Sequence, residues 1–261
     1  MQVNLSVVII TFNEEANIGR CLDSVQGVAD EVVVVDSFST DQTKALCLQR
    51  GVTFLEHPFS GHIEQKNYAL TQAAFEYVLS LDADEALTDE LKAAVLEAKN
   101  NWQADVYGMN RLTSYCGKWI RHGGWYPDRK LRLFDRRKVA WGGQNPHDTI
   151  IPVKGAVIAG VKGDLLHYSY TSIRQHLTQI NNFTDSALQE MIQRGKRVSM
   201  LGLVLKPPFR FFRMYFLQLG LLDGFEGFCI AMLSSYAVFA KYAKLYMYNK
   251  YKEQDENDSD K

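Results

Sequence analysis

The tripeptide Asp82-Ala83-Asp84 offers two carboxylates for chemistry directly after YVLSL, an apolar run that is typical of a strand. In an extended segment alternate side chains point to the same side, so both carboxylates can face one point. Two such charges repel each other unless a cation lies between them. Mg2+ and Mn2+ bind proteins through one or two carboxylates together with substrate phosphates. The tripeptide therefore predicts a metal site for a diphosphate, and a solvated turn is the alternative for so short a motif.

The first half of the chain alternates short apolar runs with helical patterns. We expect strands at residues 5–11, 31–36, 52–55 and 77–81, and helices at 14–25, 41–50, 63–75 and 88–99. Repeated units of this length predict an α/β protein with a mainly parallel sheet. Ligands of such sheets bind beyond the carboxyl ends of the strands. Polar segments follow three of these ends, at 11–14, 36–41 and 82–85, and we expect them to meet at one edge.

The later part of the chain has a different pattern. Glycines, aromatic residues and short strand-like runs between residues 105 and 167 indicate a mixed sheet with long loops, and a helix is expected over 172–194. The sequence contains neither G-x-G-x-x-G nor a P-loop motif, which removes the main support for dinucleotide and P-loop sites. Asp36 ends the second expected strand, where it can bind a ribose or base or can cap the next turn.

Composition excludes several classes of protein. Apolar residues make up 46% of the 261 residues and charged residues 23%, which is typical of a folded globular protein. The formal net charge of -1 provides no basic field for nucleic acid. The four cysteines form no C-x-x-C pair, so neither a zinc site nor a disulfide framework is expected. The N-terminal segment has no cationic start or cleavage site, so we expect no signal peptide.

Three segments, in order, resemble family 2 inverting glycosyltransferases with the GT-A fold. They are VVIITFNEEANIGRCLDSV, EVVVVDSFSTDQT and YVLSLDADE. Further along, GGWYPDRKLRLFDRR, PHDTI and LLHYSY are similar to the lipopolysaccharide core β-1,4-glucosyltransferase subgroup of Gram-negative bacteria. The resemblance covers roughly residues 5–170. It implies a GT-A, Rossmann-like fold, in which helices flank a mixed, mainly parallel sheet.

The resemblance also implies roles for individual residues. Those that it places at the donor nucleotide are Thr11, Asn13, Glu14, Asp36, Lys66 and Asp82. Asp82 and Asp84 would form the metal-binding motif, with Asp84 the more direct ligand. His167 follows a strand-like run, where it can reach the metal or the diphosphate or can be a core residue. The expected cofactor is a divalent cation, Mg2+ or Mn2+.

An inverting transfer requires a base that removes the proton of the acceptor hydroxyl. In the related enzymes a carboxylate late in the domain does this, and the matching segment here is Asn145-Pro146-His147-Asp148. We expect Asp148 to be the base and His147 to assist it, and a hydrogen bond within the loop is the alternative for this pair. The subgroup more often has Glu after the histidine, so the carboxylate of Asp148 is one methylene shorter.

Cationic and aromatic side chains lie between the metal motif and the expected base. The cationic residues are Arg129, Lys130, Arg132, Arg136, Arg137 and Lys138. They can bind phosphates of the donor or of an anionic acceptor, or they can protect a strand edge. Trp119, Trp125 and Tyr126 can stack on a sugar face or can pack within the protein.

Residues 206–250 combine apolar character with six Lys or Arg against two Asp or Glu. The uncharged stretch 227–240 has 14 residues, fewer than the roughly 20 that span a membrane. We therefore expect two helices in a hairpin, after a boundary at Pro207 and Pro208. Cationic flanks and aromatic residues suit helices lying on an anionic membrane surface, and packing on the catalytic domain or on another subunit of a homo-oligomer is the alternative. The expected domains are 1–205 (catalytic), 206–250 (membrane-associating) and 251–261 (disordered polar tail).

These observations favour a metal-dependent inverting glycosyltransferase. We expect it to move a hexose, glucose, from a UDP-sugar to a lipid-linked glycan, the lipopolysaccharide inner core, as a peripheral protein at the cytoplasmic face of the bacterial inner membrane. A sugar-nucleotide nucleotidyltransferase is a second hypothesis, but it normally has a Gly-rich basic loop where this chain reads TFNEEAN. A non-catalytic membrane adaptor is a third, but it has no use for the carboxylates of Asp82, Asp84 and Asp148.

Overall fold

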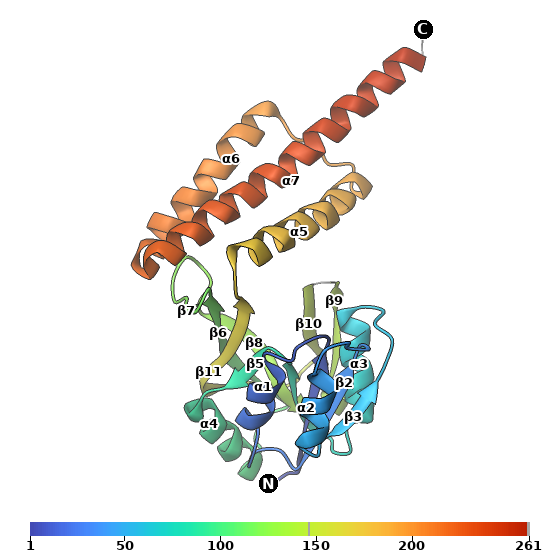
Figure 1. The fold of residues 1–261 in the computed structure, drawn as a ribbon, viewed down its shortest axis with the longest axis vertical. Coiled ribbons are helices and arrows are strands. Elements are labelled where there is room, and N and C mark those ends of the chain that lie inside the picture. The colour runs from blue at the N-terminus through green and yellow to red at the C-terminus, as the bar shows by residue number, and fades with distance from the viewer. Residues whose placement is uncertain (146, 260–261) are drawn as a thin grey trace. The chain divides into compact units, whose positions relative to one another are not determined.

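The computed structural model describes residues 1–145 and 147–259 (Figure 1). The chain divides into two compact units, and each is described by itself. Unit 1 contains Met1–Leu112 and Pro127–Tyr168, and unit 2 contains Thr113–Tyr126 and Ser169–Lys261. The domain limits expected at residues 205 and 250 both fall within unit 2.

The main sheet of the described residues has nine strands, in the order β3-β2-β1-β4-β8-β6-β11-β5, with β7 paired to β6. Their bounds are β1 Leu5–Thr11, β2 Glu31–Asp36, β3 Thr53–Glu56, β4 Tyr77–Asp82, β5 Glu85–Leu87, β6 Val106–Tyr115, β7 Lys118–Trp119, β8 Asp128–Asp135 and β11 Ile158–Tyr170. Strands β1 to β4 pair in parallel, whereas β5, β7 and β8 pair antiparallel to their neighbours. A separate antiparallel pair consists of β9 Val139–Gln144 and β10 His147–Pro152. The expected mixed sheet is confirmed.

The register of the parallel strands brings the polar strand ends together. Strand β1 lies between β2 and β4, with Thr11 opposite Asp36 and Ile10 opposite Asp82. The three strands therefore end at the same level, and the polar segments that follow them start at one edge of the sheet. This convergence is the one expected from the sequence.

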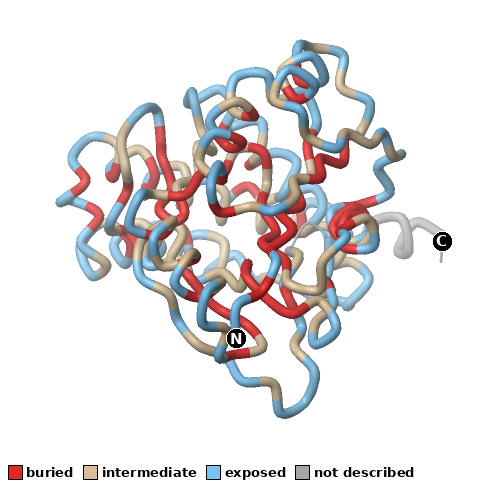
Figure 2. The backbone as a smooth tube through the Cα atoms, turned by 90° about the horizontal axis from the view of Figure 1, so that it is seen from below, coloured by how far each residue is buried: buried red, intermediate tan, exposed pale blue. Residues whose placement is uncertain are grey.

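Helices cover both faces of the parallel strands. They are α1 Ile18–Ser24, α2 Thr43–Gln49, α3 His62–Gln72 and α4 Asp89–Asn100. Val7 and Ile9 of β1 pack in an apolar cluster with side chains of α1, α2 and α4, whereas Val8 packs in a second cluster with side chains of α3. Because both faces are covered, the strands are continuous apolar runs. Figure 2 shows buried stretches of the chain in the interior, with exposed stretches around them.

Helix α1 begins at Ile18, not at residue 14 as expected. The preceding turn is held by the loop that follows β2, since the backbone N–H of Asn13 donates to Ser39 Oγ (2.7 Å) and that of Glu14 to Thr43 Oγ1 (2.8 Å). Asn13 has φ 53°, a left-handed conformation that asparagine tolerates better than most residues. Hydrogen bonds between distant loops thus prevent the helix from starting earlier.

Two short elements show what local sequence does and does not specify. Thr88 caps α4, because its Oγ1 accepts a hydrogen bond from the backbone N–H of Leu91 (3.2 Å). Strand β5 was not expected, because its three residues are too few to show alternation. It forms by antiparallel pairing with β11, a partner that is distant in the sequence.

Unit 2 contains the C-terminal helices. These are α5 Ile173–Gln193, α6 Met200–Phe212 and α7 Gly224–Ser259, with the short turns η2 Arg213–Leu217 and η3 Gly220–Asp223 between the last two. Helices α6 and α7 pack against each other, and Ser235 Oγ donates to the carbonyl of Pro207 (2.7 Å). The expected helical hairpin is therefore present.

Two expectations for this region are wrong. Pro207 and Pro208 lie inside α6 and mark no boundary. Each proline removes a helical hydrogen bond, but Pro207 is buried and bonded by Ser235 of α7, and this packing offsets the loss. Helix α7 also continues over residues 251–259, which were expected to be disordered. No glycine or proline interrupts this stretch, and several of its residues are good helix formers.

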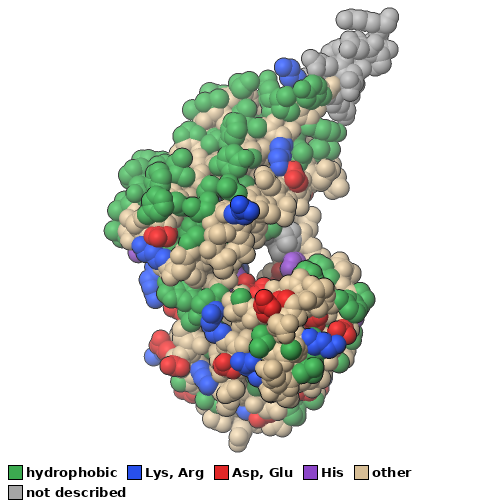
Figure 3. Space-filling view, in the orientation of Figure 1, with side chains coloured by type: hydrophobic (Ala, Val, Ile, Leu, Met, Phe, Trp, Pro, Cys, Tyr) green, Lys and Arg blue, Asp and Glu red, His purple; other side chains and the backbone are tan. Residues whose placement is uncertain are grey.

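The stretch Gly220–Tyr251 is long and apolar enough to cross a membrane, by length and composition. Only 22% of its most apolar window is buried, unlike the core helix of a soluble protein. The sequence-based expectation of a stretch too short to span a membrane considered only the uncharged residues 227–240. Helix α7 extends beyond these residues at both ends. Large apolar side chains are exposed along α6, η2 and α7, among them Leu201, Val204, Phe209, Phe212, Phe216, Phe225, Met232 and Phe239. Figure 3 shows hydrophobic side chains gathered over these helices.

Candidate active site

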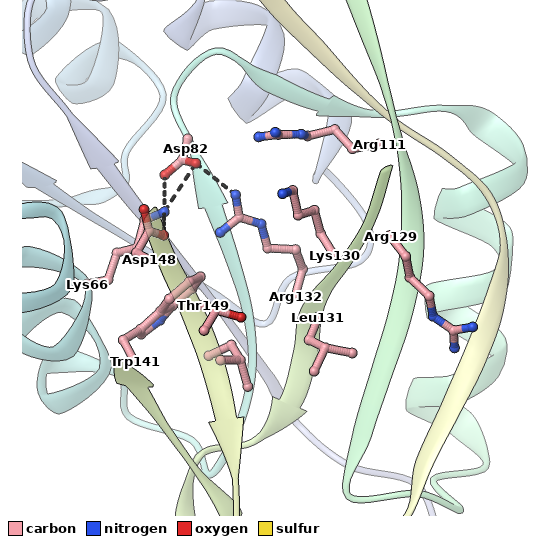
Figure 4. A pocket seen from close by; sticks show the side chains of 11 residues that line it. Lys66, Asp82, Arg111, Arg129, Lys130, Leu131, Arg132, Trp141, Asp148 and Thr149 are labelled. Atoms are coloured by element: carbon pink, nitrogen blue, oxygen red, sulfur yellow. Dashed lines mark hydrogen bonds and ion pairs between the residues drawn. The ribbon is translucent and has the colours of Figure 1, made fainter. Parts of the chain in front are cut away.

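Asp82, at the end of β4, is held between two buried cations (Figure 4). Lys66 of α3 places its Nζ 2.9 Å from Oδ1, and Arg132 of β8 places its Nη2 2.8 Å from Oδ2. Arg132 Nη2 also lies 2.9 Å from Oε1 of Glu85. The other oxygen of Glu85 accepts a hydrogen bond from the backbone N–H of Asp82 (3.1 Å). These four residues form one buried ion network.

The network shifts the pKa values of Asp82 and Arg132. Burial alone would raise the pKa of Asp82, but Lys66 and Arg132 outweigh burial and hold this pKa well below its usual range. Burial likewise disfavours the cationic form of Arg132, but Glu85 and Asp82 raise the pKa of its guanidinium above the ordinary value. Breaking a buried ion pair is costly where the remaining partner has no second opposite charge beside it. Asp82 therefore supports the site as part of an ion network.

Lys66 also contacts Asp148, with Nζ 2.7 Å from Oδ2. The β9–β10 pair carries Asp148 to α3, because Asn67 of α3 accepts from the backbone N–H of Trp141 (3.1 Å) and donates to its carbonyl (2.9 Å). The Asp148 side chain is 15% exposed. The side chain of His147, expected to assist Asp148, lies outside the described part of the chain.

A cavity of about 360 Å³ opens beside Asp148. Its lining consists of Lys66, Asp82, Arg111, Arg129, Lys130, Leu131, Arg132, Trp141, Asp148, Thr149 and Ile150. This volume lies in the range of sites for small molecules. The expected base therefore borders a space that can receive part of a substrate.

Asp84 faces a different partner from Asp82. Its Oδ2 lies 3.2 Å from Nε2 of His167, and both side chains are partly exposed. The contact arises because β5 pairs with β11, which places Glu85 opposite His167, and the backbone N–H of Tyr168 donates to the Asp84 carbonyl (2.9 Å). Two of the three expected metal ligands, Asp84 and His167, thus lie together, while Asp82 contacts cations.

The donor set of Asp84 and His167 can be tested for its fit to a divalent cation. Among the described residues no group of three or more His, Cys, Asp or Glu side chains is placed to hold a metal ion. One carboxylate and one imidazole at a partly exposed edge nevertheless fit Mn2+ or Mg2+ that is completed by substrate phosphates. Lys66 and Arg132 pair with the oxygens of Asp82, so the structure does not bring Asp82 into this set.

Asp36 and Asn13 shape the loops at the end of β1 and β2. The Asp36 carboxylate accepts from the backbone N–H (2.7 Å) and the hydroxyl (2.5 Å) of Ser39. The same hydroxyl oxygen accepts from the backbone N–H of Asn13 (2.7 Å), whose Oδ1 accepts from Thr40 N–H (2.8 Å). Asp36 therefore caps the next turn, and Ser39, which sequence analysis missed, links the two loops. The signal was the run D-S-F-S-T, which is typical of side-chain-capped turns.

Thr11 and Glu14 complete this edge. Thr11 is buried, and its Oγ1 is one of three buried side-chain polar atoms without a hydrogen-bond partner in the described chain. Glu14 accepts from Asn17 Nδ2 (2.7 Å), and burial raises the pKa of Glu14, with the negative charge of Asp84 adding to the shift. An unpaired hydroxyl and a half-buried carboxyl suit a site for a polar ligand.

Comparison with known proteins decides the family. Residues 6–155 match the profile described as "Glycosyl transferase family 2". The chain belongs to glycosyl transferase family 2. It is similar to the "Lipopolysaccharide core biosynthesis glycosyltransferase LpsC" of Rhizobium meliloti, at 32% identity over 93% of this chain and 92% of that protein. It is 30% identical to an uncharacterized glycosyltransferase of Rickettsia felis, over 92% of this chain and 89% of the relative.

The fold is similar to that of a solved mannosyltransferase. PcManGT from Pyrobaculum calidifontis, in complex with GDP-Man and Mn2+, matches with a TM-score of 0.51 and 18% identity, over 94% of this chain and 74% of that chain. This likeness supports the fold alone, and the fold is GT-A. The expectation of a family 2 glycosyltransferase with this fold is therefore confirmed.

The cationic cluster of this family 2 glycosyltransferase divides into two groups. Arg137 pairs with Asp135 (2.7 Å) and Arg136 with Glu76 (3.2 Å), so these two arginines stabilise the end of β8. Arg129, Lys130 and Arg132 instead line the cavity. In unit 2, Trp125 packs with its ring centroid 5.9 Å from that of Tyr115, which supports packing for this tryptophan.

Two charged residues here were not expected from the sequence, Glu85 of the ion network and its neighbour Arg111. Glu85 is completely buried. Arg111 of β6 lies 3.4 Å from Glu85 through Nη1 and 2.8 Å from Asp128 through Nη2. The signal for Glu85 was its place in the sequence, since it is a charged residue between the metal motif and an apolar pair. Arg111 is 26 residues away from Glu85, so no local pattern indicated their contact.

Proposed function

We propose that this family 2 glycosyltransferase is a metal-dependent inverting hexosyltransferase that transfers glucose from UDP-glucose to a lipid-linked glycan. The observation that supports this proposal best is the arrangement of its carboxylates. Asp84 lies with His167 at the edge where the parallel strands end, and Asp148 lies beside a separate cavity. A donor with its diphosphate on one side and an acceptor hydroxyl on the other would fit this arrangement.

Asp148 would act as the base. Its carboxylate takes the proton of the acceptor hydroxyl while the hydroxyl oxygen forms a bond to the anomeric carbon of the donor sugar. The bond from that carbon to the diphosphate oxygen breaks on the opposite face, so UDP leaves with the electron pair and the configuration inverts. Lys66 holds Asp148 against α3 and sets the position of this carboxylate.

The donor would lie along the ends of β1, β2 and β4. Asp84 and His167 would hold the divalent cation, which when bound supplies stabilisation of the charge on the departing diphosphate. Thr11, with its unpaired hydroxyl, and the capped loop of Asp36 would face the nucleotide. Glu14, half-buried at the same edge, would limit the space beside the metal.

The acceptor proposal draws on similarity to a relative. The name of the Rhizobium meliloti protein places that protein in lipopolysaccharide core biosynthesis. The similarity extends over 93% of the present chain. We infer an acceptor of the same class, a lipopolysaccharide inner core.

A transfer assay tests the reaction. Purified protein is incubated with UDP-glucose, Mn2+ and a deacylated or intact lipopolysaccharide core acceptor, and UDP release and product are followed by NMR. The proposal predicts a β-linked product from the α-linked donor and loss of turnover with EDTA. Full turnover without metal contradicts it. Diphosphate release from a nucleoside triphosphate and a sugar phosphate would indicate a nucleotidyltransferase, and failure to bind any nucleotide would indicate an adaptor.

The proposed location is the cytoplasmic face of the inner membrane. The exposed apolar side chains of α6 and α7 support it, as do the cationic residues Lys206, Arg210 and Lys241 of the same helices and Arg213 of η2. An amphipathic surface of this kind binds anionic lipid through apolar burial and charge attraction.

Vesicle flotation tests the location. We expect the protein to float with phosphatidylglycerol vesicles, and the double change Phe209→Asp and Phe225→Asp to abolish flotation. Val157→Asp, at an exposed apolar site of unit 1, is the matched control and should float normally. Equal flotation of all three proteins contradicts the proposal.

A further inference from the structure

We propose that the cavity beside Asp148 binds an anionic group of the acceptor, a carboxylate or a phosphate attached to the glycan. The inference rests on the proposed function, in which Asp148 is the base and the cavity is the acceptor side of the site. The inference specifies the class of acceptor as an anionic glycan. A neutral sugar would not neutralise the positive charge of this cavity or satisfy its hydrogen-bond donors.

The cavity has an excess of positive charge. Its lining contains five cationic side chains and two carboxylates. Both carboxylates, Asp82 and Asp148, are already paired with Lys66. Figure 4 shows the charged ends of Arg111, Lys130 and Arg132 directed toward the same region near Asp82. An acidic group would be attracted there, and a second cation would be repelled.

Two buried donors in the lining have no acceptor among the described residues. Arg132 Nε and the indole Nε1 of Trp141 lack a hydrogen-bond partner in this part of the chain, although both side chains are about 95% buried or more. These N–H groups only donate, so a partner must accept. Leaving a buried donor unpaired costs about 1–3 kcal/mol. A carboxylate or phosphate carries enough lone pairs to accept from both.

The indole of Trp141 is positioned by the same cations. Lys66 Nζ lies 4.5 Å and Arg132 Cζ 5.3 Å from the ring centroid, within the range of cation–π attraction. The backbone of Trp141 is bonded to Asn67 of α3 on both its N–H and its carbonyl. The ring is therefore fixed, and its N–H is held ready for a ligand without a further loss of side-chain entropy.

The cavity belongs to the acceptor side because of the residues that line it. Asp148 and Thr149 are in its lining, whereas Asp84, His167 and Thr11 are absent from the lining among the described residues. An anion in the cavity would therefore lie beside the base and not at the pair that is proposed to hold the metal and diphosphate.

Lys130 offers an adjustable contact to such an anion. Its Nζ is 3.0 Å from Asp128, and its side chain is 35% exposed. Asp128 keeps a second partner in Arg111 (2.8 Å). The ammonium can thus turn toward a ligand without leaving Asp128 unpaired, and substitution of Lys130 should not disturb the buried network.

Binding of small sugar acids tests the inference. Protein saturated with UDP and Mn2+ is titrated with glucuronate, glucose 6-phosphate and glucose, and dissociation constants are measured by calorimetry or ligand-observed NMR. We expect at least one anion to bind about tenfold or more tightly than glucose, since a hydrogen bond to a charged group contributes about 1.5–3 kcal/mol. Preference for glucuronate would identify a carboxylate, and preference for glucose 6-phosphate a phosphate. Equal binding of glucose, or displacement of UDP by the anion, overturns the inference.

Three variants make the test specific. Trp141→Phe keeps an aromatic ring and removes only the donor, and Lys130→Gln removes one charge; each should weaken the anion about tenfold and leave UDP affinity within about twofold. Lys154→Gln removes an exposed charge that does not line the cavity and should change neither constant. Unchanged anion binding in both cavity variants contradicts the inference. Anion binding without any transfer from UDP-glucose would instead count against the proposed function.

Discussion

Asp82 and Asp84 are two residues apart, yet they belong to two different sides of the site. Asp82 lies between buried Lys66 and Arg132, whereas Asp84 lies against His167, although the two aspartate side chains are similarly exposed (26% and 24%). Alternation along a strand predicts a shared direction, but β4 ends at Asp82 and the chain turns at residues 83 and 84 before β5 begins. The spacing of a motif therefore does not by itself make two carboxylates ligands of one ion.

The two sides differ in what their carboxylates do. The Asp82 side balances buried charges and positions Asp148 through Lys66, so changes there should affect stability or proton transfer. Asp84 and His167 form the pair that is proposed to hold the metal, so changes there should affect metal and donor binding. This division predicts different outcomes for substitutions on the two sides.

Replacement of the proposed base should have the largest effect on rate. Asp148→Asn removes the proton acceptor, so we expect transfer to fall by about 10²–10⁴-fold. UDP affinity should stay within about twofold, because Asp148 lines the cavity, whose described lining does not include Thr11, Asp84 or His167. Transfer kinetics and UDP calorimetry measure the two quantities. Asp148→Glu, which restores a carboxylate, should recover activity, and normal turnover in Asp148→Asn would place the base elsewhere.

Loss of Lys66 should have the largest effect on folding. Lys66→Met leaves Asp82 and Asp148 without their shared cation, and breaking a buried pair costs about 3–5 kcal/mol. Urea unfolding measures this change in the free energy of unfolding. Lys44→Met breaks the exposed pair with Glu56 and should cost about 0–1 kcal/mol. Equal effects of the two substitutions would show that the network adds nothing to stability.

His167→Gln should weaken the metal without unfolding the protein. We expect Mn2+ affinity in the presence of UDP to fall about 10–100-fold, on the scale of losses from altered metal sites. The loss for Mg2+ should be smaller, because imidazole suits transition metals better than Mg2+. Calorimetric titration with each metal measures both constants. Unchanged affinities would remove His167 from the metal site.

The smallest expected effect is a change in the pH dependence of stability, and it comes from the buried histidine His176. His176 of α5 lies against the hydroxyl of Tyr115 (3.1 Å) and the ring of Tyr170, and burial lowers its pKa to about 4. In the unfolded chain the histidine has a pKa near 6.5. Between pH 6.5 and 4 the unfolded chain therefore binds a proton that the folded protein does not. Because unfolding takes up this proton, stability falls as the pH falls through this range. The depressed pKa of Asp82 makes stability depend on pH only below about pH 4, which is the pKa of an aspartate in the unfolded chain.

Thermal melts between pH 7 and pH 4.5 measure the contribution of His176. The wild-type melting temperature should decrease over this range by more than that of His176→Phe, in which the titrating group is gone. Parallel curves for the two proteins would show that His176 does not control this pH dependence.

The sequence predicted the shared edge but not the contacts made there. Continuous apolar strands followed by polar residues were enough to place Thr11, Asp36 and Asp82 together, because parallel strands end on one side. The ion network was not predictable, since Arg111, Arg132 and Glu85 meet only through antiparallel pairing of distant strands. The start of α1 and the prolines inside α6 likewise depend on hydrogen bonds from other segments.

Metal binding by two single variants tests the division of the site most directly. Mn2+ is titrated into Asp84→Asn and Asp82→Asn with UDP present, and circular dichroism confirms that both are folded. Asp82→Asn leaves Arg132 paired with Glu85 and Lys66 paired with Asp148, so its fold should persist. We predict that Asp84→Asn loses Mn2+ binding while Asp82→Asn keeps it within about threefold, a difference below 1 kcal/mol. Loss of Mn2+ by Asp82→Asn and retention by Asp84→Asn, or equal loss in both, would contradict the account.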